Sequence, residues 1–474
     1  MPDRRPNILF IMSDDHAAHA MSCYGSRINR TPNLDRIAEG GMRFDNCFCT
    51  NSICTPSRAA IMAGTYNHVN GCTTLATHMD NNLVTFPKLL REDGYQTAIF
   101  GKWHLGEGAA HCPTGFDDWA VLPGQGLYHN PTFIFPGPDG GVRRNVPGYA
   151  TDIITDMSLD WLERRDREKP FCLLYHHKAP HREWEPDEKH AGMYLNEFIA
   201  EPDTLFDDYA GRASAVALAK MRVGRDMSEM DIKAKLNRKL PEMELRKWAY
   251  QRYIKDYLRV IASIDDNVGR ALDYLDAEGL AENTIVIYTS DQGFFLGDHG
   301  WYDKRYMYEE SLRMPFILRF PREVAAGSVN KDMVLNVDFA QTFLDYAGVA
   351  APEHMQGRSF RPALRGQTPA DWRQSMYYRY WMHADGCHNA CAHYGIRTHR
   401  HKLICYYGDD CGQAGANPDP RPVEWELFDL EKDPREMNNL YAHPDCQGLI
   451  RELKAHLHRL QAEVGDKRYE KDVD

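Results

Sequence analysis

Short apolar runs that end in polar residues recur along the chain. Residues 7–12 form a largely apolar run that ends in a polar turn at residues 13–16, and residues 284–289 form another that ends at Ser290 and Asp291. Runs of this length that lack alternation are typical of strands buried on both faces of a parallel sheet. The same pattern predicts further strands at residues 96–101, 170–175 and 315–319.

Segments with helical periodicity separate these runs, and they predict helices at residues 86–93, 152–165 and 253–276. Strands that alternate with helices favour a doubly wound α/β sheet. Residues 185–252 are highly charged, and we expect them to form a helical, partly irregular insertion over that sheet. We therefore assign residues 1–370, including this insertion, to one large α/β domain.

The pattern changes from about residue 371, where Tyr and His become dense. Short antiparallel strands are predicted at residues 395–398, 402–407 and 425–430. Residues 448–464 have helical periodicity. We therefore expect residues 371–474 to form a small α+β C-terminal subdomain with an antiparallel sheet and a helix.

Composition limits the classes of partner. The chain has 474 residues, of which 43% are hydrophobic, and this is enough for a large core. Its net charge of −12 argues against nucleic acid, because phosphate binding favours a basic surface. No apolar run approaches the roughly 20 residues that span a bilayer, so we expect no membrane partner. A homo-oligomer is compatible with the sequence, which does not specify the oligomeric state.

The amino terminus lacks the long apolar stretch and the small-residue cleavage site of a secretory signal. We therefore expect a cytoplasmic protein, with a trimmed periplasmic or secreted form as the alternative. The 12 cysteines are scattered, which favours reduced thiols over a disulfide framework. The pairs Cys47/Cys49 and Cys387/Cys391 lack a second ligand pair at zinc-finger spacing, so no structural zinc site is expected.

Several predicted strands end in residues that can take part in chemistry. Lys102 and His104 follow one strand, and the histidine-rich residues 176–181 follow another. In open α/β sheets, ligands bind beyond the carboxyl ends of the strands. Helix caps and solvated side chains would explain any one of these groups alone, but their convergence predicts a functional site.

Two further strand ends carry three carboxylates and one amide. These residues are Asp14, Asp15, Asp291 and Gln292. Carboxylate and amide oxygens suit hard cations such as Ca²⁺ and Mg²⁺. Three carboxylates at one point repel each other, so the set favours a bound divalent cation.

Cys54 opens a predicted helical stretch at residues 58–64, and Pro56 fits the first turn of that helix. One hypothesis is that Cys54 acts as a thiolate nucleophile whose pKa is lowered by Arg58. The sequence offers no clear partner base for this role.

At these residues the chain resembles the sulfatase family. Residues 54–58, Cys-Thr-Pro-Ser-Arg, match the Cys-x-Pro-Ser-Arg signature in which the cysteine is oxidised to formylglycine. The resemblance covers nearly the whole chain in the order that the family has. It continues in residues 6–15, 31–35, 59–64, 94–106, 290–293 and 425–439, and in Lys304.

The resemblance implies a fold, a metal and a protein partner. The implied fold is an α/β alkaline-phosphatase-like sandwich, with a large, mostly parallel sheet flanked by helices and a small C-terminal subdomain. The implied metal is Ca²⁺, with Mg²⁺ or Mn²⁺ as alternatives, held by Asp14, Asp15, Asp291, Gln292 and Cys54 as formylglycine. Gln292 stands where the family more often has Asn. The implied protein partner is the formylglycine-generating enzyme.

The resemblance also implies a catalytic set around Cys54. His104 would accept a proton from the second hydroxyl of the nucleophile, and His181 with Lys304 would protonate the departing alcohol. The metal, Arg58, Lys102 and Lys304 would neutralise the sulfuryl oxygens as the ester bond breaks. The implied set is Cys54, Arg58, Lys102, His104, His181 and Lys304.

Residues 177–182, 294–304 and 307–311 resemble the branch of N-acetylglucosamine-6-sulfatase-like enzymes and arylsulfatases. We therefore expect a sulfuric ester hydrolase that acts on a sulfated sugar, either a small molecule or an oligosaccharide, and also on aryl sulfates.

Substrate contacts are expected from two regions. In the catalytic set, Lys102, His181 and Lys304 are expected to bind the sulfate. The subdomain residues predicted to reach the site and bind sugar hydroxyls are His383, His388, His393 and Arg397. A polar surface of the small sheet is the alternative interpretation of these four.

Two other functions stay open from the sequence. A phosphonate or phosphate ester hydrolase would use the same nucleophile, because sulfuryl and phosphoryl centres share size and tetrahedral oxygens. A non-catalytic carbohydrate-binding protein would leave Cys54 unmodified, but it would have no need for a nucleophile signature, a proton donor and a base together. A two-zinc phosphatase is disfavoured, because no second set of His and Asp ligands stands at matching positions.

Overall fold

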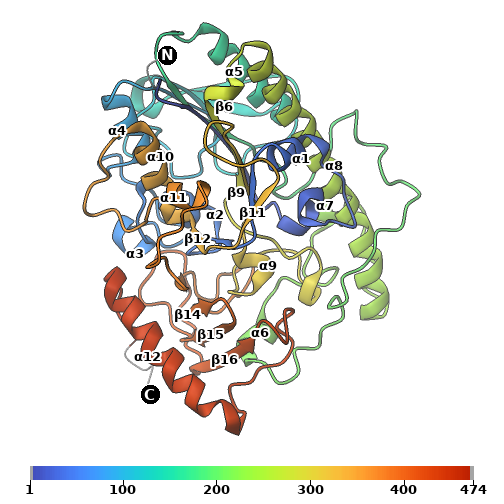
Figure 1. Ribbon diagram of the computed structural model, residues 1–474. Helices are drawn as coiled ribbons and strands as arrows, with labels where there is room; N and C mark the ends of the chain where they lie inside the picture. Colours follow the sequence, from blue (N-terminus) through green and yellow to red (C-terminus); the bar gives the residue numbers. More distant parts are fainter. Residues whose placement is uncertain (1–3, 470–474) are drawn as a thin grey trace.

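The larger of two main sheets dominates the computed structural model, which describes residues 4–469 (Figure 1). Its strands, in spatial order, are β11 (Ser328–Asn330), β2 (Met42–Phe44), β10 (Phe316–Arg319), β9 (Thr284–Ser290), β1 (Asn7–Ser13), β8 (Phe171–His176), β4 (Gln96–Lys102), β5 (Asp118–Leu122), β6 (Thr132–Phe135) and β7 (Val142–Asn145). The central strands β9, β1, β8, β4 and β5 are parallel. Antiparallel pairing is confined to β10 and β2 on one side and to β6 and β7 on the other.

Helices cover both faces of this sheet. On β1, Ile8 and Phe10 belong to one cluster of buried side chains, whereas Leu9 and Ile11 belong to another. Because both faces of the strand are buried, nearly every position in it is apolar. The first face is covered by α2 (Cys54–Ala63), α4 (Phe86–Glu92) and α10 (Phe339–Ala347). The second face is covered by α1 (Pro32–Glu39), α5 (Ala150–Arg164) and α8 (Glu242–Ala277).

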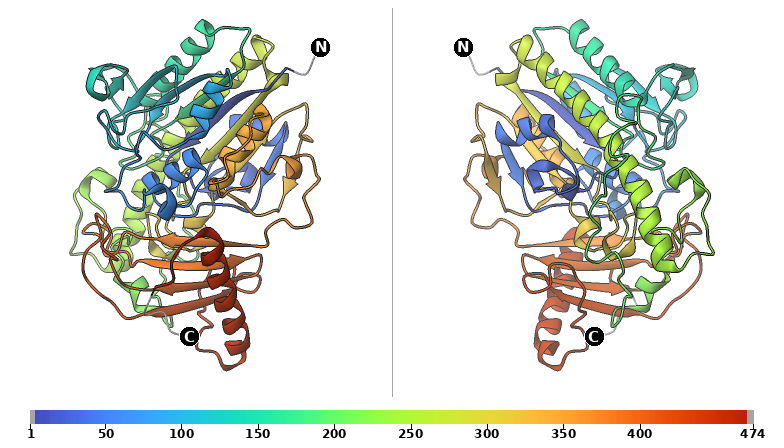
Figure 2. Two further views of the ribbon diagram at one scale, coloured as in Figure 1. Left: turned by 90° about the vertical axis from the view of Figure 1, so that its left-hand side faces the viewer. Right: turned by 90° about the vertical axis from the view of Figure 1, so that its right-hand side faces the viewer.

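A second, antiparallel sheet is built by the C-terminal part of the chain. Its strands are β13 (Ser375–Tyr380), β14 (His393–Thr398), β15 (His401–Tyr406) and β16 (Glu424–Asp429), in that spatial order. The helix α12 (Gln447–Val464) packs on it through Leu453 and Leu457. Figure 2 shows this sheet and α12, in orange and red, beyond one end of the large sheet.

The elements expected from the apolar pattern are present. All five predicted strands form, and the predicted large parallel sheet and small antiparallel sheet are confirmed. The strands β2, β5, β6, β7 and β11 of the large sheet and β13 of the small sheet were not predicted. The helix α8 begins at Glu242, earlier than the periodicity indicated. The boundary between residues 370 and 371 stays a prediction.

The charged insertion at residues 185–252 is helical in only part of its length. It contains α6 (Ser214–Leu218), α7 (Glu229–Ile232) and the start of α8, joined by irregular segments. Within residues 4–469, none of the helices combines the length and the apolar character that crossing a membrane requires.

Candidate active site

Four parallel strands end around one point. Asp14 and Asp15 follow β1, Asp291 follows β9, and Lys102 is the last residue of β4. His181 follows β8 by five residues. All five side chains are buried. The convergence predicted from the strand ends is therefore present at the carboxyl edge of the sheet.

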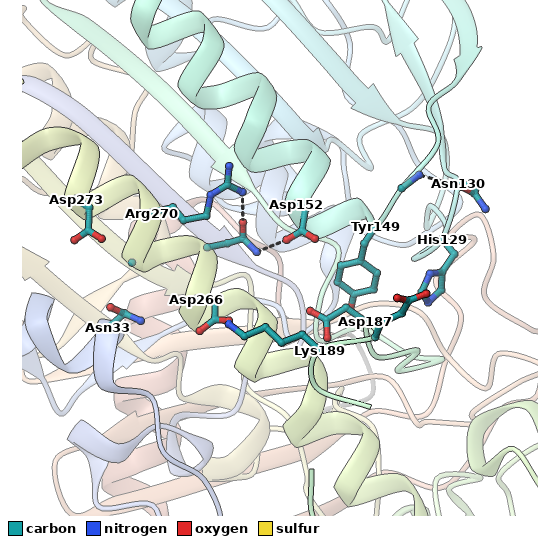
Figure 3. Close-up of a pocket in the computed structure, with 14 residues that line it drawn as sticks. Asn33, His129, Asn130, Tyr149, Asp152, Asp187, Lys189, Asp266, Arg270 and Asp273 are labelled. Atoms are coloured by element: carbon teal, nitrogen blue, oxygen red, sulfur yellow. Dashed lines mark hydrogen bonds and ion pairs between the residues drawn. The ribbon is translucent and has the colours of Figure 1, made fainter. Parts of the chain in front are cut away.

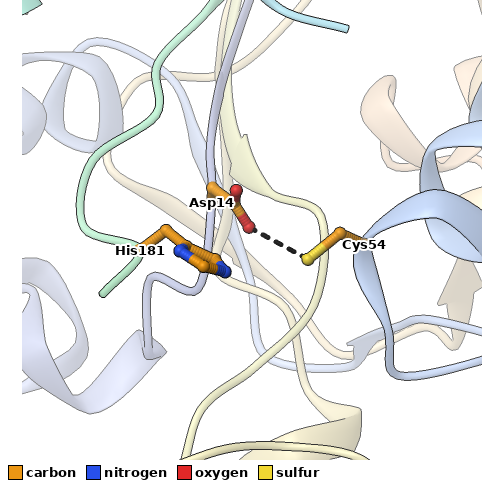
Figure 4. Close-up of side chains that lie close together, drawn as sticks. All are labelled: Asp14, Cys54 and His181. Carbon is orange, nitrogen blue, oxygen red and sulfur yellow. Dashed lines mark hydrogen bonds between the residues drawn. The ribbon is translucent and has the colours of Figure 1, made fainter. Parts of the chain in front are cut away.

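Cys54 is the first residue of α2 and faces this edge (Figure 4). Its Sγ lies 3.3 Å from Oδ1 of Asp14, and both atoms lie within 4.8 Å of a ring nitrogen of His181. Ile53 is extended, which starts the helix at Cys54. The free backbone N–H groups of a helix amino terminus favour negative charge, so this position suits an anionic group.

Two residues of the next helical turn fix α2 against the strand ends. Ser57 Oγ donates a hydrogen bond to the carbonyl of Asp291. Arg58 Nε donates to the Asp291 carboxylate over 2.9 Å, and its Nη1 donates to the Lys102 carbonyl over 2.9 Å. Arg58 Nη2 is buried and has no hydrogen-bond partner among the described residues. The guanidinium therefore retains one donor for a further group.

Three carboxylates share this edge. Oxygens of Asp14, Asp15 and Asp291 lie within 4.8 Å of one another. Two ammonium groups oppose their charge: Lys304 Nζ lies 2.5 and 2.6 Å from the two carboxylate oxygens of Asp15, and Lys102 pairs with Asp14. The two lysines thus supply the positive charge that offsets the carboxylates of Asp14 and Asp15.

Gln292 completes the set of oxygen donors. Its Nε2 donates to Oδ1 of Asp15 over 2.5 Å. Its Oε1 is buried and accepts no hydrogen bond from the described residues. A buried acceptor without a partner beside three carboxylates fits a hard divalent cation such as Ca²⁺ or Mg²⁺, which prefers oxygen ligands.

Burial dominates the electrostatics of the site. It raises the pKa of Asp15 to about 6, although Lys304 opposes the rise. It also raises the pKa of the Cys54 thiol to about 12. A thiol with that pKa stays protonated at neutral pH, so the thiolate hypothesis gains no support. For His181, burial and the charge of Lys102 hold the pKa well below its usual value.

A pocket of about 360 Å³ opens onto Cys54, His181 and Lys304. Its lining also includes charged and polar side chains from several distant loops: Gln125, Lys178, Arg182, Asp303, Arg305 and His388. Of these, His388 was predicted to reach the site, and Lys178 belongs to the segment 176–181 that was predicted to lie there. Asp303 and Arg305 flank Lys304, a predicted site residue, in the sequence. This adjacency was the sequence feature that could have identified them as pocket residues.

The pocket wall contains a network of paired charges. His388 Nε2 lies 3.1 Å from Asp303, and Arg305 Nη2 lies 2.7 Å from His388 Nδ1. Burial alone would raise the pKa of Asp303, but His388 and Lys304 hold it well below its usual range. Gln125, also in the pocket lining, accepts a hydrogen bond at its Oε1 from Lys102 over 2.6 Å.

His104 lies beside a neighbouring cavity of about 330 Å³. Its backbone is left-handed, with φ 56°, and its carbonyl accepts a hydrogen bond from Thr55 Oγ1 over 2.8 Å. Its Nδ1 is buried without a partner among the described residues. Leu75 lines both this cavity and the pocket at Cys54. His104 thus lies next to the Cys54 segment but does not line the pocket itself.

The predicted substrate contacts of His393 and Arg397 are not supported. His393 is fully buried, and its Nε2 accepts a hydrogen bond from the backbone of Met307 over 3.1 Å. Arg397 donates to both carboxylate oxygens of Glu309. Neither residue lines the pocket, because β14 directs both side chains into internal contacts. His383 is likewise buried, with hydrogen bonds to the backbone.

A larger surface cavity of about 750 Å³ lies between α5 and α8 (Figure 3). Its charged side chains are mostly paired: Lys189 with Asp266, and Asp152 with the Asn267 amide at 2.7 Å. It contains none of the predicted site residues. The chemistry is therefore assigned to the pocket at Cys54.

The fold and this site define the class of protein. The family profile "Sulfatase" matches residues 6–349, and the profile "N-sulphoglucosamine sulphohydrolase, C-terminal" matches residues 297–463. The chain belongs to the sulfatase family, as its signature indicated. It is therefore an enzyme of the sulfuric ester hydrolase class.

Relatives named as sulfatases match nearly the full chain. The N-acetylglucosamine-6-O-sulfatase of Bacteroides thetaiotaomicron is 43% identical, over 98% of this chain and 87% of that protein. The arylsulfatase of Clostridium perfringens is 28% identical, over 92% of this chain and 90% of that protein.

Solved structures agree on the fold. One, in complex with its substrate D-glucosamine-2-N,6-O-disulfate, is 42% identical with a TM-score of 0.90, over 99% of this chain and 100% of that one. The phosphonate monoester hydrolase of Agrobacterium radiobacter, 20% identical with a TM-score of 0.76 over 97% of this chain and 96% of that one, shares the fold alone. The predicted alkaline-phosphatase-like architecture is confirmed.

Proposed function

We propose that this sulfatase removes the 6-O-sulfate from N-acetylglucosamine-6-sulfate or a closely similar glucosamine. The observation that carries this proposal is the 43% identity, across 98% of the chain, with an enzyme of that specificity. The substrate named for the 42% identical solved relative is a glucosamine sulfated at the nitrogen and at O6, so it shares the glucosamine ring and the ester position but has no acetyl group.

The pocket supports a substrate of this size. Its volume of about 360 Å³ lies at the lower end of the range for small-molecule sites. Asp303, Arg305 and His388 offer both acceptors and donors for sugar hydroxyls along its wall. We therefore infer that the enzyme acts on a single sugar unit, either free or at the end of an oligosaccharide.

We infer that Cys54 is converted to formylglycine. The hydrated aldehyde would supply a geminal diol, of which one hydroxyl attacks sulfur and the other allows sulfate to be expelled. Arg58 supports this role, because its Nη2 has no partner among the described residues and is available to the modified side chain. The amino terminus of α2 adds backbone N–H groups that favour negative charge there.

We infer that Asp14, Asp15, Asp291 and Gln292 bind Ca²⁺. When bound, such a cation would acidify a hydroxyl at residue 54 and offset charge on the sulfuryl oxygens. The structure supports the ligand set through the clustered carboxylates and the unpartnered Gln292 oxygen.

The lysines of the site are proposed to bind the sulfate. Lys102 and Lys304 now pair with Asp14 and Asp15. A divalent cation bound to these two carboxylates would take the place of the lysines as their partner. Both ammonium groups would then be free to bind the substrate. Lys178 also lines the pocket, and burial lowers its pKa to about 8, so it is mostly charged at neutral pH. These cations would stabilise charge on the three sulfuryl oxygens.

His181 is the proposed proton donor to the leaving oxygen. Its Nδ1 lies 2.7 Å from the Arg182 carbonyl, which assigns a proton to Nδ1 and leaves Nε2 to exchange the second proton. Burial, together with the nearby lysines, lowers the pKa of His181 and keeps the resting ring neutral. An anionic sulfate in the pocket would offset their charge and favour the protonated ring, which can then donate from Nε2.

His104 is the proposed base that accepts a proton when sulfate is expelled. Burial and the charge of Lys102 hold the pKa of His104 well below its usual value, so the ring is neutral. Its Nδ1 has no partner among the described residues. A neutral ring with a free nitrogen is suited to accept a proton.

The test is sulfate release by the modified enzyme with Ca²⁺. We expect kcat/KM for N-acetylglucosamine-6-sulfate to exceed that for galactose-6-sulfate and 4-nitrophenyl sulfate by at least about tenfold. Preference for a phenyl phosphonate monoester would instead indicate a phosphonate hydrolase. Sugar binding without turnover, in native-host protein whose Cys54 is unmodified, would indicate a binding protein.

A further inference from the structure

The turn after β1 holds two of the proposed calcium ligands in a demanding backbone conformation. Asp14 and Asp15 are adjacent, and Asp15 has φ 69°, in the left-handed region. Aspartate enters this region more readily than most residues, but surrounding contacts must still hold it there. The position of the Asp15 carboxylate therefore depends on what fixes its backbone.

One hydroxyl group closes this turn. Tyr257, on α8, is fully buried, and its hydroxyl donates to the Asp15 carbonyl over 2.7 Å. The same oxygen accepts a hydrogen bond from the backbone N–H of Ala17 over 2.9 Å. The single hydroxyl thus forms hydrogen bonds with two backbone groups, one on either side of His16. Its one proton is used in the bond to Asp15.

The ring of Tyr257 contacts the other segment that carries proposed ligands. It stacks on Phe294 with ring centroids 5.6 Å apart and an interplanar angle of 15°. Phe294 follows Gln292 by two residues, just beyond the end of β9. One side chain from α8 therefore contacts both the turn at Asp15 and the segment that contains Asp291 and Gln292.

We propose that Tyr257 is a positioning residue for the divalent cation: it holds the Asp15 turn, relative to the Asp291 segment, in the geometry that binding requires. The inference rests on the proposed function, because it presupposes a cation at Asp14, Asp15 and Asp291. Groups that orient metal ligands without touching the metal contribute strongly to affinity, because they fix the ligands before binding.

The chain offers a matched control on the same helix. Tyr253 lies one turn before Tyr257 on α8 and is also fully buried. Its hydroxyl has no hydrogen-bond partner among the described residues. Tyr253→Phe and Tyr257→Phe therefore remove the same atom from the same helix, but only Tyr257→Phe releases the Asp15 turn.

The experiment is calcium titration by calorimetry of the full chain, with melting temperatures of all proteins measured in EDTA. We expect Tyr257→Phe to raise the Kd for Ca²⁺ by about tenfold or more, as is usual for the loss of a group that orients ligands. We expect Tyr253→Phe to bind within twofold of the parent. Because the calcium affinity is measured directly, a general loss of stability, which the EDTA melting temperatures report, would not by itself produce this difference.

Three results would overturn the inference. Equal Kd values for Tyr257→Phe and the parent would exclude a positioning role, while leaving the cation site and the proposed function intact. Equal weakening by both variants would assign the effect to general packing of α8. No calcium binding by the parent protein would remove the cation site itself, and with it the corresponding part of the proposed function.

Discussion

Two clusters of buried charge differ in which groups meet in them. At the carboxyl edge of the large sheet, Gln292 Oε1 and Arg58 Nη2 lack partners among the described residues, and a pocket opens beside them. In the second cluster, at the C-terminal sheet, Glu309 pairs with Arg397 and Lys402.

The fourth member of this second cluster completes the contrast. Glu436 pairs with Lys402 at 2.6 Å and accepts a hydrogen bond from the Glu309 backbone over 2.7 Å. Each carboxylate there thus has a cation of the chain as its partner. Buried charge and unpartnered polar atoms occur in both regions, since Arg397 Nη1 also lacks a hydrogen-bond partner among the described residues. What identifies the reactive site is that three carboxylates meet within 4.8 Å of one another beside Cys54 and an unpartnered amide oxygen.

The largest expected effect is at the nucleophile. Cys54→Ala should lower kcat for sulfate release by about 10⁴-fold or more, because the attacking group is lost. Sulfate release under single-turnover and steady-state conditions measures this change. Cys387→Ala, at an exposed thiol beside the pocket residue His388, is the control and should retain activity within about twofold. Comparable activity of Cys54→Ala would contradict the assignment.

Removal of a charged partner from the C-terminal cluster should lower the stability of the protein. Arg397→Leu leaves Glu309 with one fewer cation in a buried site, and we expect a loss of about 4 kcal/mol in the free energy of unfolding. KM should stay unchanged, because Arg397 does not line the pocket. Urea denaturation and steady-state kinetics test both points. A raised KM with unchanged stability would restore Arg397 as a substrate contact.

His299 is a buried residue outside both clusters, and it should make the stability of the protein depend on pH. Burial alone would lower the pKa of His299, but its hydrogen bond to Asp207 (2.9 Å) and the Glu310 carboxylate raise it to about 9. Because this pKa lies above the unfolded value near 6.5, the stabilisation is complete below pH 6.5 and is lost as pH rises through 9. The expected loss is about 3 kcal/mol, because each tenfold difference in proton affinity between the folded and unfolded states corresponds to about 1.4 kcal/mol.

Denaturation curves at pH 6.5 and pH 9.5 measure this effect. The variant His299→Gln cannot take up the proton, so its stability should vary less over the same interval. An equal pH dependence in both proteins would assign the change to other groups.

The smallest effect concerns the fourth oxygen ligand. Gln292→Ala should weaken calcium binding by about tenfold, or about 1.4 kcal/mol, because one oxygen is removed from the set. Gln341→Ala is a matched control, since Gln341 is also buried with an Oε1 that has no partner among the described residues. Titration calorimetry measures the calcium affinity of both variants. Unchanged affinity in Gln292→Ala would restrict the ligands to the carboxylates.

The sequence predicted the strands β1, β4, β8, β9 and β10 and the residues at their ends, because apolar runs report burial on both faces of a sheet. It did not predict β2, β5, β6, β7 and β11 of the same sheet. Asp14, Lys102 and Asp291 could be grouped for this reason, since parallel strands bring their carboxyl ends together. His393 and Arg397 were misjudged, because the dense Tyr and His pattern does not reveal which face of a small sheet is covered.

Loops account for the rest. Gln125 and Arg182 reach the pocket through irregular segments whose course no periodicity encodes. Glu242, the first residue of α8, follows a charged stretch that resembles an exposed loop as closely as a helix. Such positions are fixed by tertiary contacts, which the pattern of a single sequence does not contain.

The most direct test is mass spectrometry of the tryptic peptide Phe44–Arg58 from protein made in its native host. The account predicts that Cys54 has lost its thiol and has the mass of the aldehyde or its hydrate. An unmodified thiol throughout, in that host, would contradict the central claim and would require new roles for the residues around Cys54.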